Sequence, residues 1–262
     1  MQPELRRAID ELIEREQITG YDPFGFRPEA LDFAAPPVHW LYRNYFRCEL
    51  SGLENVPEGR VLLVANHSGQ LPIDAAMIAM ALLVAGERPR AVRSMIERFV
   101  PTLPFVFTFL NRAGQLVGTP DNARRLLRRE NALLVFPEGA RGISKPFSQR
   151  YELERFGTGF MRLALETNTP IVPVGVVGAE EQYISLGNMP TIARMMSAPS
   201  FPMLLNLLPL PVKYRIRFGE PIVFSGDPED EDRVIRSHVR QVSSEVETLI
   251  ADGLREREGW FQ

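Results

Sequence analysis

Residues 62–80, "LLVANHSGQLPIDAAMIAM", join two apolar runs through a short polar turn. His67 follows directly after the first run, and Asp74 opens the second. A short apolar run bounded by turn residues predicts a strand buried on both faces, whereas the longer second run predicts a helix. The pattern therefore indicates an α/β fold, with His67 at the carboxyl end of a strand, where open α/β sheets usually bind ligands.

The same alternation of strands and helices continues along the chain. Short apolar runs predict strands at residues 60–66, 90–94, 131–137, 169–178 and 213–221. Helical patterns occupy residues 74–85, 120–130, 159–168 and 229–258. Because several strands are apolar on both faces, we expect a mixed, mainly parallel sheet covered by helices. The two prolines in the run at 169–178 favour a position near a sheet edge or a bulge.

The two ends of the chain suggest how it is organised. Charges throughout residues 1–18 predict a helix, and the aromatic-rich stretch 33–46 predicts a second, shorter one. We therefore expect residues 1–48 to be an N-terminal helical segment and residues 49–262 to be one α/β domain. The stretch 33–46 and the proline-broken apolar stretch 189–211 are candidates for core packing or for facing lipid, and both alternatives stay open.

Composition excludes several classes of protein. The chain has 262 residues and a formal net charge of −3, so it carries no electrostatic footprint for nucleic acid. Cys48 is its only cysteine, which excludes an intrachain disulfide and a multi-cysteine metal site. We expect Cys48 to be a packed thiol in a reducing, cytosolic setting. The longest apolar run, residues 75–84, is shorter than the roughly 20 residues of a membrane-spanning helix.

His67 and Asp74 are the first candidates for chemistry. His67 suits a ligand-binding or proton-accepting role, and a histidine bonded to neighbouring backbone is the structural alternative. Asp74 has two compatible roles, as the N-cap of the following helix and as a partner for His67. Six residues separate them, so the two side chains meet only if the intervening loop doubles back.

The turn "FPEGARG", residues 136–142, is the second candidate. Gly139 permits close approach of the backbone to a ligand, and Arg141 offers a planar fork suited to phosphate or carboxylate. Glu138 adds an acid to the same turn. A strand-terminating turn with a solvated Glu–Arg pair is the structural alternative.

Taken in order, these segments resemble a known family. "NHSGQLPID" at 66–74, "FPEGARG" at 136–142 and "PIVPV" at 170–174 resemble the lysophospholipid and glycerol-phosphate acyltransferase superfamily. The branch that they resemble most includes bacterial acylglycerol-phosphate acyltransferases and monoacylglycerol acyltransferase-like proteins. The resemblance runs from about residue 50 to about residue 221, which makes residues 49–262 the expected acyltransferase domain.

The resemblance implies a role for each matching residue. His67 would be the general base that deprotonates an acceptor hydroxyl, and Asp74 would orient it. Glu138, Gly139 and Arg141 would belong to the acceptor site, with Arg141 facing a phosphate. Pro173 would form part of the pocket wall. No cofactor is implied, since acyl-CoA or an acyl carrier protein is the acyl donor.

Two departures from the family pattern leave the acceptor open. Members usually have four residues between the histidine and the aspartate, and many phosphate-acceptor members carry an arginine upstream of the "FPEG" element. The corresponding stretch here, residues 113–127, offers "GTP" near that place, and no motif match selects Arg112, Arg124 or Arg125 instead. A 1-acylglycerol-3-phosphate, a neutral monoacylglycerol, another lysophospholipid and an unrelated hydroxyl or amine acceptor are all credible.

The expected activity has two competitors. A thioesterase or lipid hydrolase would use the same dyad to activate water, although the chain has no "GxSxG" elbow. A non-catalytic lipid-binding protein is the other alternative. For the leading hypothesis, an enzyme of phospholipid and lipid metabolism, we expect a cytoplasmic protein that is peripheral on the inner face of a membrane.

Overall fold

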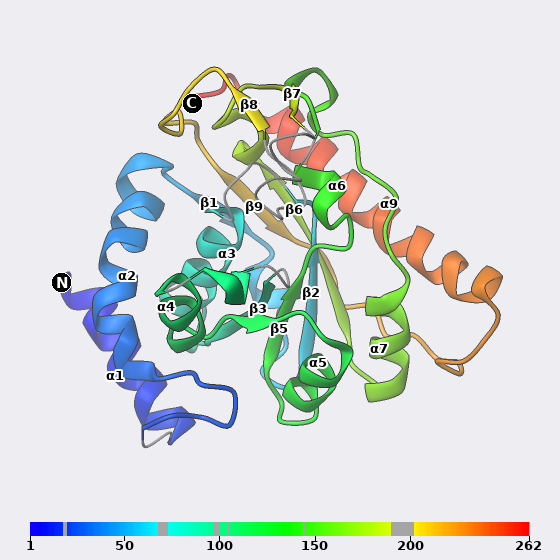
Figure 1. The fold of residues 1–262 in the computed structure, drawn as a ribbon, viewed down its shortest axis with the longest axis horizontal. Coiled ribbons are helices and arrows are strands. Elements are labelled where there is room, and N and C mark those ends of the chain that lie inside the picture. The colour runs from blue at the N-terminus through cyan, green and yellow to red at the C-terminus, as the bar shows by residue number, and fades with distance from the viewer. Residues whose placement is uncertain are drawn as a thin grey trace.

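The computed structural model describes residues 1–17, 20–67, 73–96, 100–103, 105–143, 145–189 and 202–261. Its centre is a seven-stranded sheet with the order β1-β9-β6-β2-β5-β3-β4 (Figure 1). The strands are β1 (Glu49–Ser51), β2 (Val61–Ala65), β3 (Val92–Ile96), β4 (Leu116–Val117), β5 (Ala132–Val135), β6 (Ile171–Val177) and β9 (Arg215–Phe218). A small antiparallel sheet pairs β7 (Ser185–Asn188) with β8 (Pro202–Leu204).

Helices cover both faces of the large sheet (Figure 1). The α-helices are α1 (Pro3–Glu16), α2 (Leu31–Trp40), α3 (Ile73–Val84), α4 (Val106–Arg112), α5 (Pro120–Leu127), α6 (Ala140–Ile143), α7 (Gly159–Thr167) and α9 (Asp232–Glu256). Short 3-10 turns are η1 (Pro28–Ala30), η3 (Leu53–Asn55), η4 (Val100–Thr102), η5 (Phe147–Gln149) and η6 (Ala179–Glu181), and a π-helical turn, η2 (Leu41–Tyr45), extends α2. One core cluster joins the sheet to α1, α2 and α3, and the other joins it to α5, α7 and α9.

The sequence pattern of β2 explains its central position. Val61, Leu63 and Ala65 belong to the α1–α3 core, whereas Leu62 and Val64 belong to the opposite core. All five side chains are fully buried. A strand with two apolar faces needs helices on both sides, and each large aliphatic side chain buried in this way contributes about 1.5–3 kcal/mol.

Strand pairing confirms the expected mixed, mainly parallel sheet. Only β6 and β9 pair in the antiparallel sense within the large sheet, among the residues that the structure describes. The parallel strands direct their carboxyl ends to one edge, so the segments that follow β2, β5 and β6 lie near each other. These segments contain most of the residues singled out in the sequence.

The expectation of an edge position for residues 169–178 is wrong, because β6 lies in the interior of the sheet between β2 and β9. Its pairing is nevertheless irregular at Pro173, which has no N–H to donate. Between the pairs Val174↔Phe218 and Ile171↔Ile222, β6 advances three residues and its partner four. This extra residue is a bulge, the feature that the prolines also indicated.

The N-terminal helices share their core with the rest of the protein. Leu5, Ile9 and Leu12 of α1 are fully buried in the same cluster as the inner face of α3. Most of the stretch 189–211 lies outside the described residues, apart from the region around β8. Across the described ranges, no helix combines the length and the apolar character needed to cross a bilayer.

Candidate active site

Backbone contacts at the carboxyl end of β2 hold His67 in place. The side-chain amide of Asn66 donates to the carbonyl of Val176 at 3.1 Å and accepts from the N–H of the same residue at 2.8 Å. The N–H of His67 donates to Oε1 of Glu138 at 2.8 Å. Three neighbouring strand ends are therefore tied together at the point where the histidine leaves the sheet.

The structure brings His67 and Asp74 into contact despite the six residues between them. Nδ1 of His67 lies 2.9 Å from Oδ2 of Asp74. The carboxylate is fully buried, whereas the imidazole keeps 16% of its surface exposed. A buried carboxylate on one ring nitrogen is the arrangement that orients a histidine as a base.

The N-cap role expected for Asp74 is replaced by a related one. Asp74 is the second residue of α3, which begins at Ile73, so it does not occupy the cap position. Its Oδ1 accepts the N–H of Ala75 at 2.8 Å. The N–H groups of the first turn of a helix need partners, so this bond helps to hold the Asp74 carboxylate in place at the start of α3.

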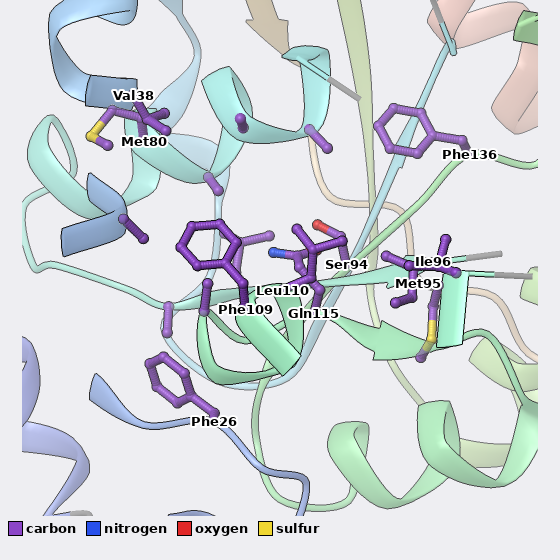
Figure 2. A pocket seen from close by; sticks show the side chains of 18 of the residues that line it. Phe26, Val38, Met80, Ser94, Met95, Ile96, Phe109, Leu110, Gln115 and Phe136 are labelled. Atoms are coloured by element: carbon purple, nitrogen blue, oxygen red, sulfur yellow. The ribbon is translucent and has the colours of Figure 1, made fainter. Parts of the chain in front are cut away.

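An apolar cavity of about 710 Å³ reaches the histidine. His67 stands at one part of its wall, and the ring of Phe136 stacks on the imidazole at 4.2 Å between centroids. The wall continues over α2, α3, α4 and β3 (Figure 2). The site thus combines a proton-accepting group with room for a long apolar ligand.

Glu138 is bound to the protein itself. It is buried, and its Oε2 accepts the N–H of Glu154 at 2.8 Å and lies 3.3 Å from Nζ of Lys145. Together with the bond from His67, these contacts use both carboxylate oxygens. Glu138 therefore positions the backbone of the histidine, and its predicted contact with substrate stays a prediction.

Lys145 links Glu138 to a second buried acid, Glu180. Nζ of Lys145 lies 3.3 Å from Oε2 of Glu180, and it donates to the carbonyl of Glu152 at 2.9 Å. Burial raises the pKa of Glu180 to about 7, and the nearby Lys145 opposes that rise. One buried cation thus serves two buried carboxylates, and Glu180 is the acid whose ionisation is disfavoured near neutral pH.

The remaining predicted site residues lie in different surroundings. Gly139, at φ 60°, lines the cavity, as a residue that approaches a ligand should. Arg141 is exposed, and its Nη2 donates to the carbonyl of Arg155 at 2.8 Å. Pro173 lies within β6 and is absent from the described cavity wall. The structure therefore groups His67, Asp74, Glu138 and Gly139 and leaves the other two apart.

The arginines considered as substitutes for the missing motif arginine also lie away from the described cavity wall. Arg124 forms an ion pair with Glu166, with Nη2 to Oε2 at 3.0 Å. The guanidinium of Arg125 lies over the ring of Phe24, 5.3 Å from its centroid. Both are committed to packing between helices and loops.

Sequence reasoning missed several residues of this region. Lys145, Glu180, Phe136 and Asn66 were not singled out, although Lys145 offered a signal: it is one of only two lysines in a chain rich in arginine. Lysine is the cation that a compact buried site accommodates as a point charge. The expectation for Cys48 agrees with the structure, since burial raises the pKa of its thiol and makes it a poor nucleophile.

Comparisons with known proteins connect this geometry to a family. The chain is similar to an uncharacterised protein of Mycobacterium leprae (strain TN), 39% identical over an alignment of 222 residues that covers 79% of this chain and 60% of that protein. It is also similar to a "Probable 1-acyl-sn-glycerol-3-phosphate acyltransferase" of Mycoplasma pneumoniae, 28% identical over 167 residues, which are 61% of this chain and 58% of that protein. The chain therefore spans about three fifths of the length of these relatives.

Animal and structural relatives extend the comparison. A "DGAT1/2-independent enzyme synthesizing storage lipids" of Gallus gallus is 28% identical over 178 residues, which are 67% of this chain and 52% of that protein. The crystal structure of the 1-acyl-sn-glycerophosphate (LPA) acyltransferase PlsC from Thermotoga maritima has the same fold, with a TM-score of 0.56, 19% identity, and coverage of 88% of this chain and 80% of that one.

The acyltransferase family model matches residues 47–177, half of the chain. The matched segment contains the joined His67–Asp74 pair and the "FPEGARG" turn that anchors it. Because this match covers half of the chain and includes both members of the histidine–aspartate pair, the chain belongs to the acyltransferase superfamily.

Proposed function

We propose that this protein transfers a fatty acyl group from an acyl thioester to the hydroxyl of a glycerolipid. The observation that carries the proposal is the 2.9 Å contact between His67 and the buried Asp74 beside an apolar cavity of about 710 Å³. An acyl thioester needs both features, a base near its carbonyl and an apolar volume for its chain.

In this proposal Asp74 holds Nδ1, and Nε2 of His67 accepts the proton of the acceptor hydroxyl. The hydroxyl oxygen attacks the thioester carbonyl carbon and forms a tetrahedral intermediate. As the carbon–sulfur bond breaks, the imidazolium returns the proton to the sulfur, which leaves as a free thiol. The products are an ester and a thiol, and no group of the protein becomes acylated. A positioned base of this type contributes roughly 10²–10⁴ to the rate.

The acceptor has two candidates. A 1-acylglycerol-3-phosphate is the acceptor implied by the family resemblance and by the name of the Mycoplasma relative. A neutral monoacylglycerol is favoured by the positions of two arginines. Arg141 lies outside the described cavity wall and binds the Arg155 carbonyl, and Arg90, which lines the cavity, donates to the carbonyls of Pro57 and Gly59. Acyl-CoA and an acyl carrier protein are both suitable donors.

Membrane association forms part of the proposal. Phe33 and Trp40 of α2 are exposed, as are Phe105 and Phe109 at α4, and Phe109 also lines the cavity. Aromatic side chains are favoured at the interface between water and lipid. A peripheral position on the inner face of a membrane would give lipid acceptors a short route to the site.

A panel of donors and acceptors tests the proposal. Purified protein is supplied with acyl-CoA or acyl carrier protein thioesters and with lysophosphatidate or monoacylglycerol, and both esterified product and free fatty acid are measured. His67→Ala should abolish ester formation while the protein stays folded. His238→Ala, a histidine of α9 that packs on Phe224, serves as the matched control and should retain activity.

Three outcomes contradict the proposal. Near-normal ester formation by His67→Ala would remove the histidine from its role as base. Release of free fatty acid that is insensitive to added acceptor would instead identify a thioesterase. If neither donor nor any lipid acceptor is consumed while the protein binds lipid, the non-catalytic alternative holds.

A further inference from the structure

A buried hydroxyl in the cavity wall has no hydrogen-bond partner among the residues that the structure describes. Ser94 lies in β3, is 3% exposed, and lines the cavity. Its Oγ is buried, and no described residue lies within hydrogen-bonding distance and geometry of it. Buried polar groups in proteins are nearly always hydrogen-bonded, so an exception that faces a cavity points to a ligand.

Gln115 places a second polar side chain beside Ser94. Strands β3 and β4 are parallel, with Met95 paired to Leu116, so Ser94 and Gln115 occupy the preceding position on neighbouring strands. Met95 and Leu116 pack against the α5–α7 core. Because side chains alternate along a strand, Ser94 and Gln115 face the opposite side, toward the cavity. Figure 2 shows both among the lining side chains, near Leu110 and Phe109.

The other polar groups of the described cavity wall are committed elsewhere. His67 is held by Asp74, and the guanidinium of Arg90 donates to two backbone carbonyls. The rest of the wall is aliphatic, aromatic, thioether or glycine. Ser94 and Gln115, called the polar pair below, therefore form an isolated hydrogen-bonding position in an apolar cavity.

The polar pair is too far from the histidine to take part in acyl transfer. Ser94 is in register with Leu134 of β5, which is in register with Leu63 of β2, four residues before His67. From strand geometry, Ser94 lies about 13 Å from His67 along the strands, toward their amino ends, and about 10 Å from it across the sheet. A chain whose thioester lies at His67 would reach the polar pair with its interior carbons.

We propose that the cavity takes acyl chains that carry a hydroxyl group along their length, and that the polar pair binds this hydroxyl. This inference rests on the proposed acyl transfer and names the class of its donor. A hydroxyl donates one hydrogen bond and accepts others, and both the serine hydroxyl and the glutamine amide can complement it. A plain chain in the same place leaves the polar pair without hydrogen-bond partners. The plain chain should therefore bind less favourably than the hydroxylated one.

Competition between matched donors tests this inference. Thioesters of one chain length, plain or with a hydroxyl at successive positions along the chain, are compared by kcat/KM. We expect a hydroxyl at one mid-chain position to raise kcat/KM about tenfold over the plain chain, the effect of one added hydrogen bond. Ser94→Ala and Gln115→Leu should each remove most of that preference, measured as the ratio of kcat/KM between the hydroxylated and the plain donor.

Met80→Leu, an apolar change in the same cavity wall, is the control and should alter both donors equally. Equal kcat/KM for plain and hydroxylated donors at every position would overturn the inference, since the polar pair would then hold only water. A preference that persists in both Ser94→Ala and Gln115→Leu would overturn it as well. Turnover of the plain donor by the unaltered protein tests the proposed acyl transfer separately. Displacement of a bound fluorescent fatty acid by plain or hydroxylated fatty acids measures the preference for a hydroxyl without any turnover.

Discussion

Replacing Glu180 by glutamine should change how the stability of this protein depends on pH. Glu180 and Glu138 both lie 3.3 Å from Nζ of Lys145, and all three side chains are buried. One cation offsets one carboxylate, so the second negative charge is poorly compensated. Glu180→Gln removes that charge and retains an oxygen that can accept the N–H of Tyr151, which now donates to Oε2 of Glu180 at 3.0 Å.

The magnitude follows from the pKa of Glu180, which burial raises from 4.5 to about 7. Between these two values the folded protein holds a proton that the unfolded chain has lost, so the stability of the native protein falls as pH rises through this window. Each unit of pKa difference is worth about 1.4 kcal/mol, which gives a loss of about 3 kcal/mol between pH 4.5 and 7. Below pH 4.5 this loss disappears.

Urea denaturation of the native protein and of Glu180→Gln at several pH values measures this effect. We expect similar free energies of unfolding near pH 4.5 and an advantage of about 3 kcal/mol for the variant above pH 7. Glu152→Gln, an exposed glutamate between η5 and α7 whose backbone carbonyl also contacts Lys145, controls for the loss of one negative charge. A constant difference between Glu180→Gln and the native protein across this range would show that Glu180 does not titrate there, and would refute the reasoning.

Three further predictions concern the dyad, the turn that anchors it, and the membrane. Asp74→Asn should lower kcat by about 10²–10⁴ in steady-state assays, because the amide cannot stabilise an imidazolium; unchanged kcat with reduced stability would leave Asp74 a purely structural residue. Gly142→Ala should destabilise the protein by about 1–3 kcal/mol in thermal unfolding. The new Cβ would lie 2.9 Å from Cβ of Glu138 and 3.1 Å from Cβ of His67, which is too close for unstrained packing. A variant as stable as the native protein would contradict this packing. The double change of Phe33 and Trp40 to serine should weaken co-sedimentation with liposomes severalfold, since both exposed side chains would otherwise enter the interface; equal binding by the native protein and this variant would place the contact elsewhere.

Local patterns were sufficient to predict most elements of the fold. The helix expected at residues 74–85 is α3 (Ile73–Val84), and the helix expected at 229–258 is α9 (Asp232–Glu256). Both carry patterns of apolar residues long enough to distinguish a helix from a strand. The predicted strand at 60–66 is β2, whose two apolar faces indicated its burial on both sides. The prediction of an edge position for β6 was wrong. A proline lacks a backbone N–H at one residue, and this does not determine which strands pair on either side of it.

The sequence by itself determined which residues are available for chemistry: a histidine and an aspartate after β2, and a glutamate-containing turn after β5, each beside an apolar run. Only the tertiary structure decided how they are used. Spacing along the chain does not specify distance across a loop, so the 2.9 Å contact of His67 with Asp74 depends on where α3 docks. Likewise, the parallel sheet brings β2, β5 and β6 to one edge, and this convergence allows Glu138 to hold the backbone of His67 and Asn66 to bind Val176. Contacts between residues 71 or more positions apart depend on the packing of the whole sheet, which no local pattern encodes.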